Sequence, residues 1–173
     1  MIAGPSLIPS LPEQVARYLD GDDLLGRAGQ AFQLSTVDES GWPRSAHLSV
    51  GEVLATDAHH LNLCLWAHSG TCRNMMRDRR ATLSLVLDGG VFEIQLRATP
   101  VEAPQPRSTA TAVMPGDHAG EPQLAFFRAT VESTKEHRAK YAEVTTGVSY
   151  RLHSPNEVLA RWAAQISWLR NII

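Results

Sequence analysis

The chain has 173 residues, of which 43% are hydrophobic and 20% charged, a composition typical of a globular domain rather than a disordered segment. Lys and Arg number 16 against 18 Asp and Glu, so the formal net charge of −2 gives no electrostatic footprint for nucleic acid. No apolar run is long enough to predict a membrane span, and the start lacks the basic region of a signal peptide, so we expect a cytoplasmic protein.

Residues 1–30 are predicted to form an N-terminal helical segment that packs on the rest of the protein. Ser10 and Glu13 have the spacing of a capping box, and Pro12 is tolerated in the first turn of a helix. The segment ends in an acidic, glycine-containing stretch that breaks helical periodicity.

The remaining residues, 31–173, are predicted to form one domain that consists mainly of strands. Alternating or continuous apolar patterns predict strands in six stretches: 31–38, 43–56, 61–67, 81–87, 91–102 and 147–152. Gly51 interrupts the second stretch and indicates either a bend or two separate strands. Short turns between these stretches favour a mostly β, antiparallel barrel with helices at its margins.

The C-terminal half contains three less regular segments. Residues 103–122 are rich in proline and predict a loop insert. Residues 124–144 read as a strand to about 134, followed by a helical stretch. The pair Ser154–Pro155 has the form of a helix start and predicts a C-terminal helix over 155–170.

Cys64, His68 and Cys72 are spaced by four residues, which on one helix would align three metal ligands. Here the spacing crosses a strand, a turn and a helix start, so the alignment is lost. We therefore expect no metal site and interpret the two cysteines as buried thiols.

Residues 68–74, "HSGTCRN", combine a turn with the start of a short helix. Free amides at a helix N-terminus, the hydroxyls of Ser69 and Thr71 and the guanidinium of Arg73 together suit an anion such as a phosphate. The alternative is structural: Ser69 is a plain N-cap and Arg73 a solvated cation.

The order of these pieces resembles the pyridoxamine 5′-phosphate oxidase-like, FMN-binding split-barrel superfamily. The hairpin pattern "L-x-T-x-x-x-x-G-x-P" of that superfamily is matched by Leu34, Thr36, Gly41 and Pro43. The serine turn, a short helix with an asparagine and a strand returning to the barrel follow in the same order over residues 69–87. The resemblance covers about residues 31–102.

The resemblance implies a six-stranded antiparallel split barrel that forms a homodimer and holds FMN at the subunit interface. It implies an oxidoreductase that acts on a small molecule, with no catalytic residue that the sequence can name. Seven residues are predicted to contact the cofactor: Ser69, Thr71 and Arg73 at the phosphate, His47 and Ser49 near the ring, Trp66 beside it, and Asn74 on the helix.

Four positions depart from the family pattern: Thr71 stands where the family often has a lysine that neutralises the phosphate, Ala46 and Gly51 stand in place of an arginine and a lysine, and Arg97 stands in place of a glycine. A bound FMN would then need Arg44, Arg73 or a residue of the second subunit to balance its charge. The alternatives are a non-catalytic module that binds flavin, a deazaflavin coenzyme or haem, and an apo dimeric structural barrel.

Overall fold

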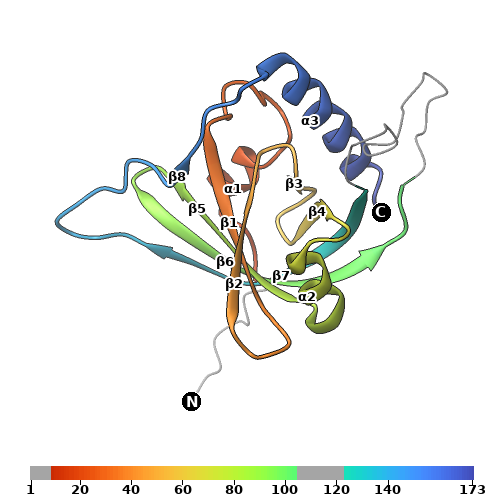
Figure 1. Cartoon of the computed structure of the whole chain (residues 1–173). Coiled ribbons are helices and arrows are strands. Elements are labelled where there is room, and N and C mark those ends of the chain that lie inside the picture. Colours follow the sequence, from red (N-terminus) through yellow and green to blue (C-terminus); the bar gives the residue numbers. More distant parts are fainter. Residues whose placement is uncertain (1–8, 105–122) are drawn as a thin grey trace.

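The computed structural model describes residues 9–104 and 123–173, and the predicted loop at 103–122 lies almost wholly outside this part of the chain. Three helices and eight strands follow one another in this order: α1 (Glu13–Tyr18), β1 (Gln30–Val37), β2 (Pro43–Leu48), β3 (Val53–Ala55), β4 (His60–Trp66), α2 (Gly70–Asp78), β5 (Arg80–Leu87), β6 (Gly90–Val101), β7 (Leu124–His137), β8 (Val148–Ser149) and α3 (Pro155–Arg170). Figure 1 shows a strongly curved sheet with α3 at the top of the view and α2 below it.

All strand pairs are antiparallel, and the sheet runs in the order β2-β1-β5-β6-β7-β4-β3, with β8 added beside β1. The two end strands of this path, β2 and β3, are consecutive in sequence and are joined by the short turn 49–52. Two edges of one sheet can meet in so few residues only if the sheet curls back on itself. The mostly β, antiparallel split-barrel class predicted from the sequence is therefore confirmed. The sheet has eight strands rather than the six expected, and the short β3 and β8 account for the difference.

The barrel interior follows the alternation of the strands. On β6, for example, Phe92, Ile94 and Leu96 are buried, while the side chains between them face outward or are partly covered. Each fully buried Phe, Ile or Leu contributes roughly 1.5–3 kcal/mol of hydrophobic stabilisation.

β4 differs because it is buried on both faces. Leu61 and Leu63 belong to the barrel core, whereas Cys64 belongs to a second apolar cluster formed with α3. In this cluster Ile166 and Leu169 of α3 pack over β3, β4 and β7. The C-terminal helix is therefore part of the fold's core.

The start of α1 departs from the prediction. The residue at the N-cap is Pro12, and no side chain caps the helix. The Leu11 amide donates to the Ala58 carbonyl at 2.7 Å, and the Leu11 side chain is buried. This contact holds the segment before the helix against the β3–β4 turn, so Ser10 does not form the predicted capping box.

The segment 124–144 also departs from the prediction. β7 continues to His137, and no helix follows it before α3. The cause is tertiary pairing, because β6 is long enough for Val91 to pair with His137. The helix-forming residues after 134 are thus held in strand conformation by their partner strand.

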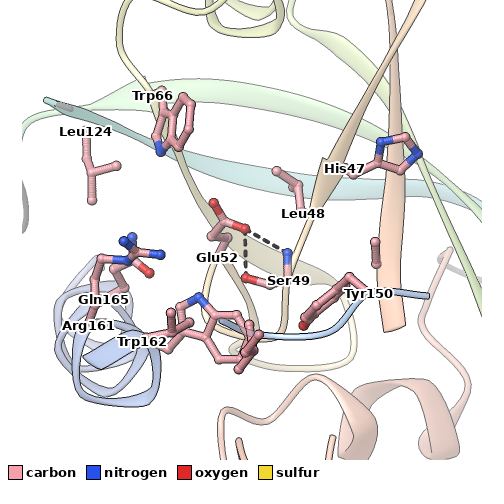
Figure 2. Close-up of a pocket in the computed structure, with 13 residues that line it drawn as sticks. His47, Leu48, Ser49, Glu52, Trp66, Leu124, Tyr150, Arg161, Trp162 and Gln165 are labelled. Carbon is pink, nitrogen blue, oxygen red and sulfur yellow. Dashed lines mark hydrogen bonds between the residues drawn. The ribbon is translucent and has the colours of Figure 1, made fainter. Parts of the chain in front are cut away.

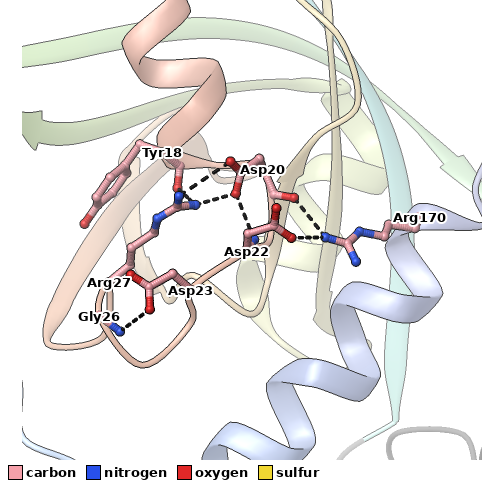
Figure 3. A network of polar contacts seen from close by, with 7 residues as sticks. All are labelled: Tyr18, Asp20, Asp22, Asp23, Gly26, Arg27 and Arg170. Carbon is pink, nitrogen blue, oxygen red and sulfur yellow. Dashed lines mark hydrogen bonds and ion pairs between the residues drawn. The ribbon is translucent and has the colours of Figure 1, made fainter.

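A polar network joins the segment after α1 to α3 (Figure 3). Arg27 contacts the Asp20 carboxylate and donates to the Tyr18 carbonyl at 3.0 Å. Arg170 of α3 contacts the Asp22 carboxylate at 2.7 Å and the Asp20 carbonyl at 3.2 Å. Burial acts to raise the pKa of Asp20, but the hydrogen bonds from Arg27 and the Asp22 amide, with the charges of Arg27 and Arg170, outweigh it and lower that pKa.

Candidate functional site

Two hollows lie along strand β2; the end of β4 lines one of them and α2 lines the other. The first, the α2 cleft, has a volume of about 520 Å³ and is lined by Asp38, Glu39, Ser40, Arg44, Ser45, Gly70, Thr71, Arg73, Asn74 and Arg77. The second, the Trp162 pocket, has a volume of about 240 Å³ and is lined by Ala31, His47, Leu48, Ser49, Glu52, Trp66, Leu124, Tyr150, Leu152, Val158, Arg161, Trp162 and Gln165. β2 supplies Ser45 to the cleft and His47 to the pocket, and strand geometry separates these two residues by about 7 Å on one face.

The α2 cleft contains the N-terminus of α2. Ser69 is the N-cap, and its hydroxyl oxygen accepts a hydrogen bond from the Cys72 amide at 3.1 Å. The first intrahelical bond runs from the Arg73 amide to the Ser69 carbonyl at 3.2 Å. The amides of Gly70 and Thr71 lie before that bond, so they are available to an anion in the cleft.

Three arginines line the α2 cleft, and each is held by a protein acceptor; Arg77 has a second acceptor, Asn74 Oδ1, at 3.5 Å. Arg73 donates to the His68 carbonyl at 2.8 Å, Arg77 to the Val37 carbonyl at 2.5 Å, and Arg44 to the Asp38 carboxylate at 2.7 Å. Each guanidinium carries five N–H donors, so further donors remain for a ligand.

Two carboxylates reduce the positive charge of the α2 cleft. The hydrogen bond from Arg44 is the main cause that lowers the pKa of Asp38, and the Trp42 amide adds to it. Glu39 also lines the cleft. Three guanidinium groups against two carboxylates leave one net positive charge, which favours an anion.

Asn74 has a structural contact in addition to its place in the cleft. Its side-chain amide donates to the Thr36 hydroxyl at 3.0 Å, and both residues are buried. This bond ties α2 to β1. It fixes the helix whose N-terminus forms the cleft.

The Trp162 pocket lies where the two edges of the sheet approach each other. Figure 2 shows Glu52 near its centre, with Trp66 on one side and Trp162 on the other. The same carboxylate oxygen of Glu52, Oε2, accepts from the Ser49 amide at 2.7 Å and from the Ser49 hydroxyl at 2.8 Å. Burial raises the pKa of Glu52, and the two bonds from Ser49 and the charge of Arg161 only partly oppose it.

The seven predicted site residues fall into three places: His47, Ser49 and Trp66 line the Trp162 pocket, Thr71, Arg73 and Asn74 line the α2 cleft, and Ser69 is the N-cap of α2 and lines neither hollow. The structure also shows that the Ser49 hydroxyl is bound to Glu52. Arg44, which the sequence suggested as a substitute for the missing lysine, does line the cleft, and Arg77 joins it.

The sequence reasoning missed the residues that form the far wall of the pocket. Glu52 follows the Gly51 turn, and Tyr150, Trp162 and Gln165 come from the C-terminal part of the chain. No motif marks them, because they reach the pocket only through the curl of the sheet and the packing of α3.

Metal-binding clusters and membrane-spanning helices are both absent from the described residues. Within 9–104 and 123–173, no three His, Cys, Asp or Glu side chains are grouped to hold a metal ion. Cys64 and Cys72 are both buried and free. In the same part of the chain, no helix combines the length and the apolar character that crossing a bilayer requires.

Comparison with known proteins identifies the family. No family model matches the chain. YclD, an uncharacterised protein of Bacillus subtilis (strain 168), is 31% identical over 160 residues, which cover 92% of this chain and 96% of YclD. A Lactobacillus delbrueckii protein assigned to the pyridoxamine 5′-phosphate oxidases superposes with a TM-score of 0.51 at 17% identity, over 73% of this chain and 93% of its own.

HupZ of Group A Streptococcus superposes with a TM-score of 0.51 at 15% identity, over 78% of this chain and 99% of its own. At these identities the two solved structures establish the fold, and YclD establishes the sequence family. The chain therefore belongs to the YclD family and has the split-barrel fold of the pyridoxamine 5′-phosphate oxidase-like structures.

Proposed function

We propose that the protein is an FMN-dependent oxidoreductase that works as a homodimer on a small-molecule substrate. The observation that carries this proposal is that one strand, β2, lines both the α2 cleft, which has phosphate-binding chemistry, and the Trp162 pocket, which is lined by aromatic rings. A bound FMN would supply the hydride-transfer chemistry, and the protein would supply binding and orientation.

The α2 cleft fits the phosphate of FMN. Arg44, Arg73 and Arg77 offer planar forks that match phosphate oxygens, and the amides of Gly70 and Thr71 add donors at the positive end of the α2 dipole. Charge-assisted hydrogen bonds contribute about 1.5–3 kcal/mol each, so two arginines can replace the lysine that is absent at position 71.

The ring of FMN would extend along β2 towards the Trp162 pocket. His47 and Trp66 stand at the exposed side of this pocket and can contact a planar ring system. Glu52 and Trp162 lie further in and would face the substrate. In this arrangement the protein binds the cofactor by its phosphate and leaves the inner pocket for the reacting partner.

The homodimer is supported by large apolar side chains exposed around the cleft. These side chains are between 40% and 68% exposed: Val37, Trp42, Trp66 and Met76. They lie on the β1–β2 hairpin, at the end of β4 and on α2, the same elements that form the two hollows. A second copy placed there would cover these side chains and enclose the cofactor.

The decisive experiment compares FMN with riboflavin, which lacks the phosphate. Arg73→Ala is expected to weaken FMN binding about 10-fold to 100-fold and to leave riboflavin binding nearly unchanged. Arg17→Ala is the matched control, because Arg17 is an exposed arginine on α1 that lines neither hollow. Equal losses for FMN and riboflavin would show that Arg73 does not contact the phosphate.

Colour and turnover separate the enzyme from its alternatives. Protein incubated with excess FMN is expected to stay yellow after desalting, and a colourless sample would contradict flavin binding. Oxidation of NADH or NADPH by the yellow protein would support an oxidoreductase over a non-catalytic binding module. Sedimentation of the same sample tests the homodimer.

A further inference from the structure

The inner end of the Trp162 pocket contains hydrogen-bond acceptors that the described residues leave without donors. Gln165 is 3% exposed, and its side-chain oxygen has no hydrogen-bond partner. Both bonds that Ser49 makes to Glu52 end on Oε2, and none of the described residues donates a hydrogen bond to Oε1. The hydroxyl of Tyr150 is likewise buried without a partner.

Such an arrangement is unusual in a protein interior. Buried polar side-chain atoms almost always have a hydrogen-bond partner, because a buried acceptor without a donor is destabilising. Gln165 and Tyr150, which carry these two unpartnered atoms, line one cavity together with the half-buried Glu52. A ligand that supplies N–H donors would satisfy the Gln165 oxygen and pair with the second carboxylate oxygen of Glu52.

The walls of this pocket are flat, aromatic and fixed. Trp162 lies so close to Gly51 that a Cβ at Gly51 would meet its ring at 2.2 Å. Tyr150 packs edge-on against Trp162, with ring centroids 6.4 Å apart and an interplanar angle of 83°. Rigid aromatic walls select planar compounds, and a volume of about 240 Å³ holds one or two rings but not a whole flavin nucleotide.

We propose that the Trp162 pocket binds the planar, N–H-donating end of a small substrate, of the amidine, guanidine or amino-heterocycle class, with Glu52 and Gln165 as the acceptors. Its role as the substrate end rests on the proposed function, whereas binding of such a compound does not require flavin. Burial of Glu52 strengthens its attraction for a donor that carries positive charge.

The charges around the pocket indicate which other class of ligand could bind there. Arg161 also lines the pocket, and it is exposed, as is His47. A ligand with a carboxylate would pair with Arg161 at the rim, whereas an N–H donor would pair with Glu52 and Gln165 inside. The two classes can be distinguished with probes of the same size.

The test uses benzamidinium, benzamide and benzoate, titrated into the full-length protein and followed by tryptophan fluorescence and calorimetry. Benzamidinium is expected to bind most tightly, and Glu52→Gln is expected to weaken it about tenfold or more. Gln165→Met, which keeps the volume and removes the acceptor, is expected to weaken it too. Glu13→Gln is the matched control, because Glu13 is an exposed carboxylate on α1 that lines neither hollow, and it should leave binding unchanged.

Three results would overturn the proposal: no binding of benzamidinium, tighter binding of benzoate, or equal affinity of the wild type and both pocket variants. Thermal melts of each variant show whether a loss of affinity is only a loss of folded protein. Because Gln165→Met introduces no charge and little change in volume, it keeps the test valid if Glu52→Gln is unstable.

Titration with both benzamidinium and FMN tests this proposal separately from the proposed function. If the protein binds benzamidinium but not FMN, the result supports the proposed ligand of the pocket and contradicts the flavin-dependent function. If it binds both, benzamidinium is expected to shift the visible absorbance of the flavin. An unchanged flavin spectrum at saturating benzamidinium would overturn the role of the pocket as the substrate end.

Discussion

Replacing Gly51 by alanine tests whether the wall of the Trp162 pocket is as tightly packed as the structure shows. A Cβ built on Gly51 lies 2.2 Å from Trp162 Cγ and 2.4 Å from Trp162 Cβ. Ordinary contacts between carbon atoms begin near 3.5 Å, so the overlap exceeds 1 Å and involves an atom bonded directly to the backbone of α3. A rotamer change of Trp162 cannot relieve it.

The expected loss of stability follows from this overlap. Overpacking a buried site typically costs about 1–3 kcal/mol, and for a domain of this size each kcal/mol lowers the melting temperature by about 2–4 °C. Gly70→Ala is the matched control, because its Cβ would meet only Arg73 Nη2 at 3.8 Å. That control should be neutral or slightly stabilising, since alanine favours helix over glycine.

A double-mutant cycle shows whether Trp162 is the cause. Trp162→Ala alone should cost about 3–5 kcal/mol, because it removes a buried aromatic ring. In that background the contacts to Cγ and Cδ1 are removed and only the contact to Cβ remains, so Gly51→Ala should cost clearly less than in the wild type, and the difference is the coupling energy. Urea denaturation measures each free energy of unfolding. An unchanged cost of Gly51→Ala in the Trp162→Ala background would refute the steric argument.

Three further predictions concern polar groups in the described structure. Burial raises the pKa of Glu52 above its ordinary value of 4.5. The contribution of Glu52 to the free energy of unfolding is therefore greatest below that value and falls as pH rises through the folded-state pKa. Glu52→Gln should lack this decline in urea denaturation from about pH 4 to pH 7. Asn74→Ala should cost about 1–3 kcal/mol in the same assay, because it removes the buried bond to the Thr36 hydroxyl, and Thr36→Val in the Asn74→Ala background should add little. Because the pKa of Asp20 is lowered, its stabilising contribution is present above pH 3.8 and is lost as pH falls through the folded-state pKa. Arg27→Met should therefore lower the free energy of unfolding by about 1 kcal/mol or less near neutral pH. The free energies of unfolding of the wild type and of Arg27→Met should converge at low pH.

The sequence predicted the parts of the fold that depend on local patterns. Alternation placed Leu61, Leu63 and Leu65 on one face of β4, and all three are buried in the barrel core. The Ser154–Pro155 pair marked the residue at which α3 begins. These features depend on neighbouring residues alone, so they can be read without knowledge of the tertiary structure.

The predictions made from the sequence were wrong where long-range contacts override local conformational preference. β7 extends to His137 because β6 offers a partner as far as Val91, although the residues after 134 favour a helix. Ser10 does not cap α1 because the adjacent Leu11 is bound to Ala58. In both cases, contacts with residues distant in the chain decide the conformation.

The residues of the candidate site likewise divide into those that local sequence indicates and those that only the tertiary structure brings together. Ser69, Thr71 and Arg73 lie within one short turn and helix, so their chemistry could be recognised from their order. Glu52 and Gln165 are more than a hundred positions apart in the numbering and meet only because α3 packs beside the split in the barrel. Neither residue has a local motif, and the sequence did not indicate a pocket between them.

The turn 49–52 has a consequence for how this protein could change over generations. It connects the two ends of the sheet path, and Ser49, Gly51 and Glu52 each shape the Trp162 pocket from within it. Adding or removing a residue there would alter the width of the split and the chemistry of its inner wall at once, while the hydrogen-bonded strand pairs of the barrel remained in register. New substrate preferences could therefore arise by variation within four consecutive codons.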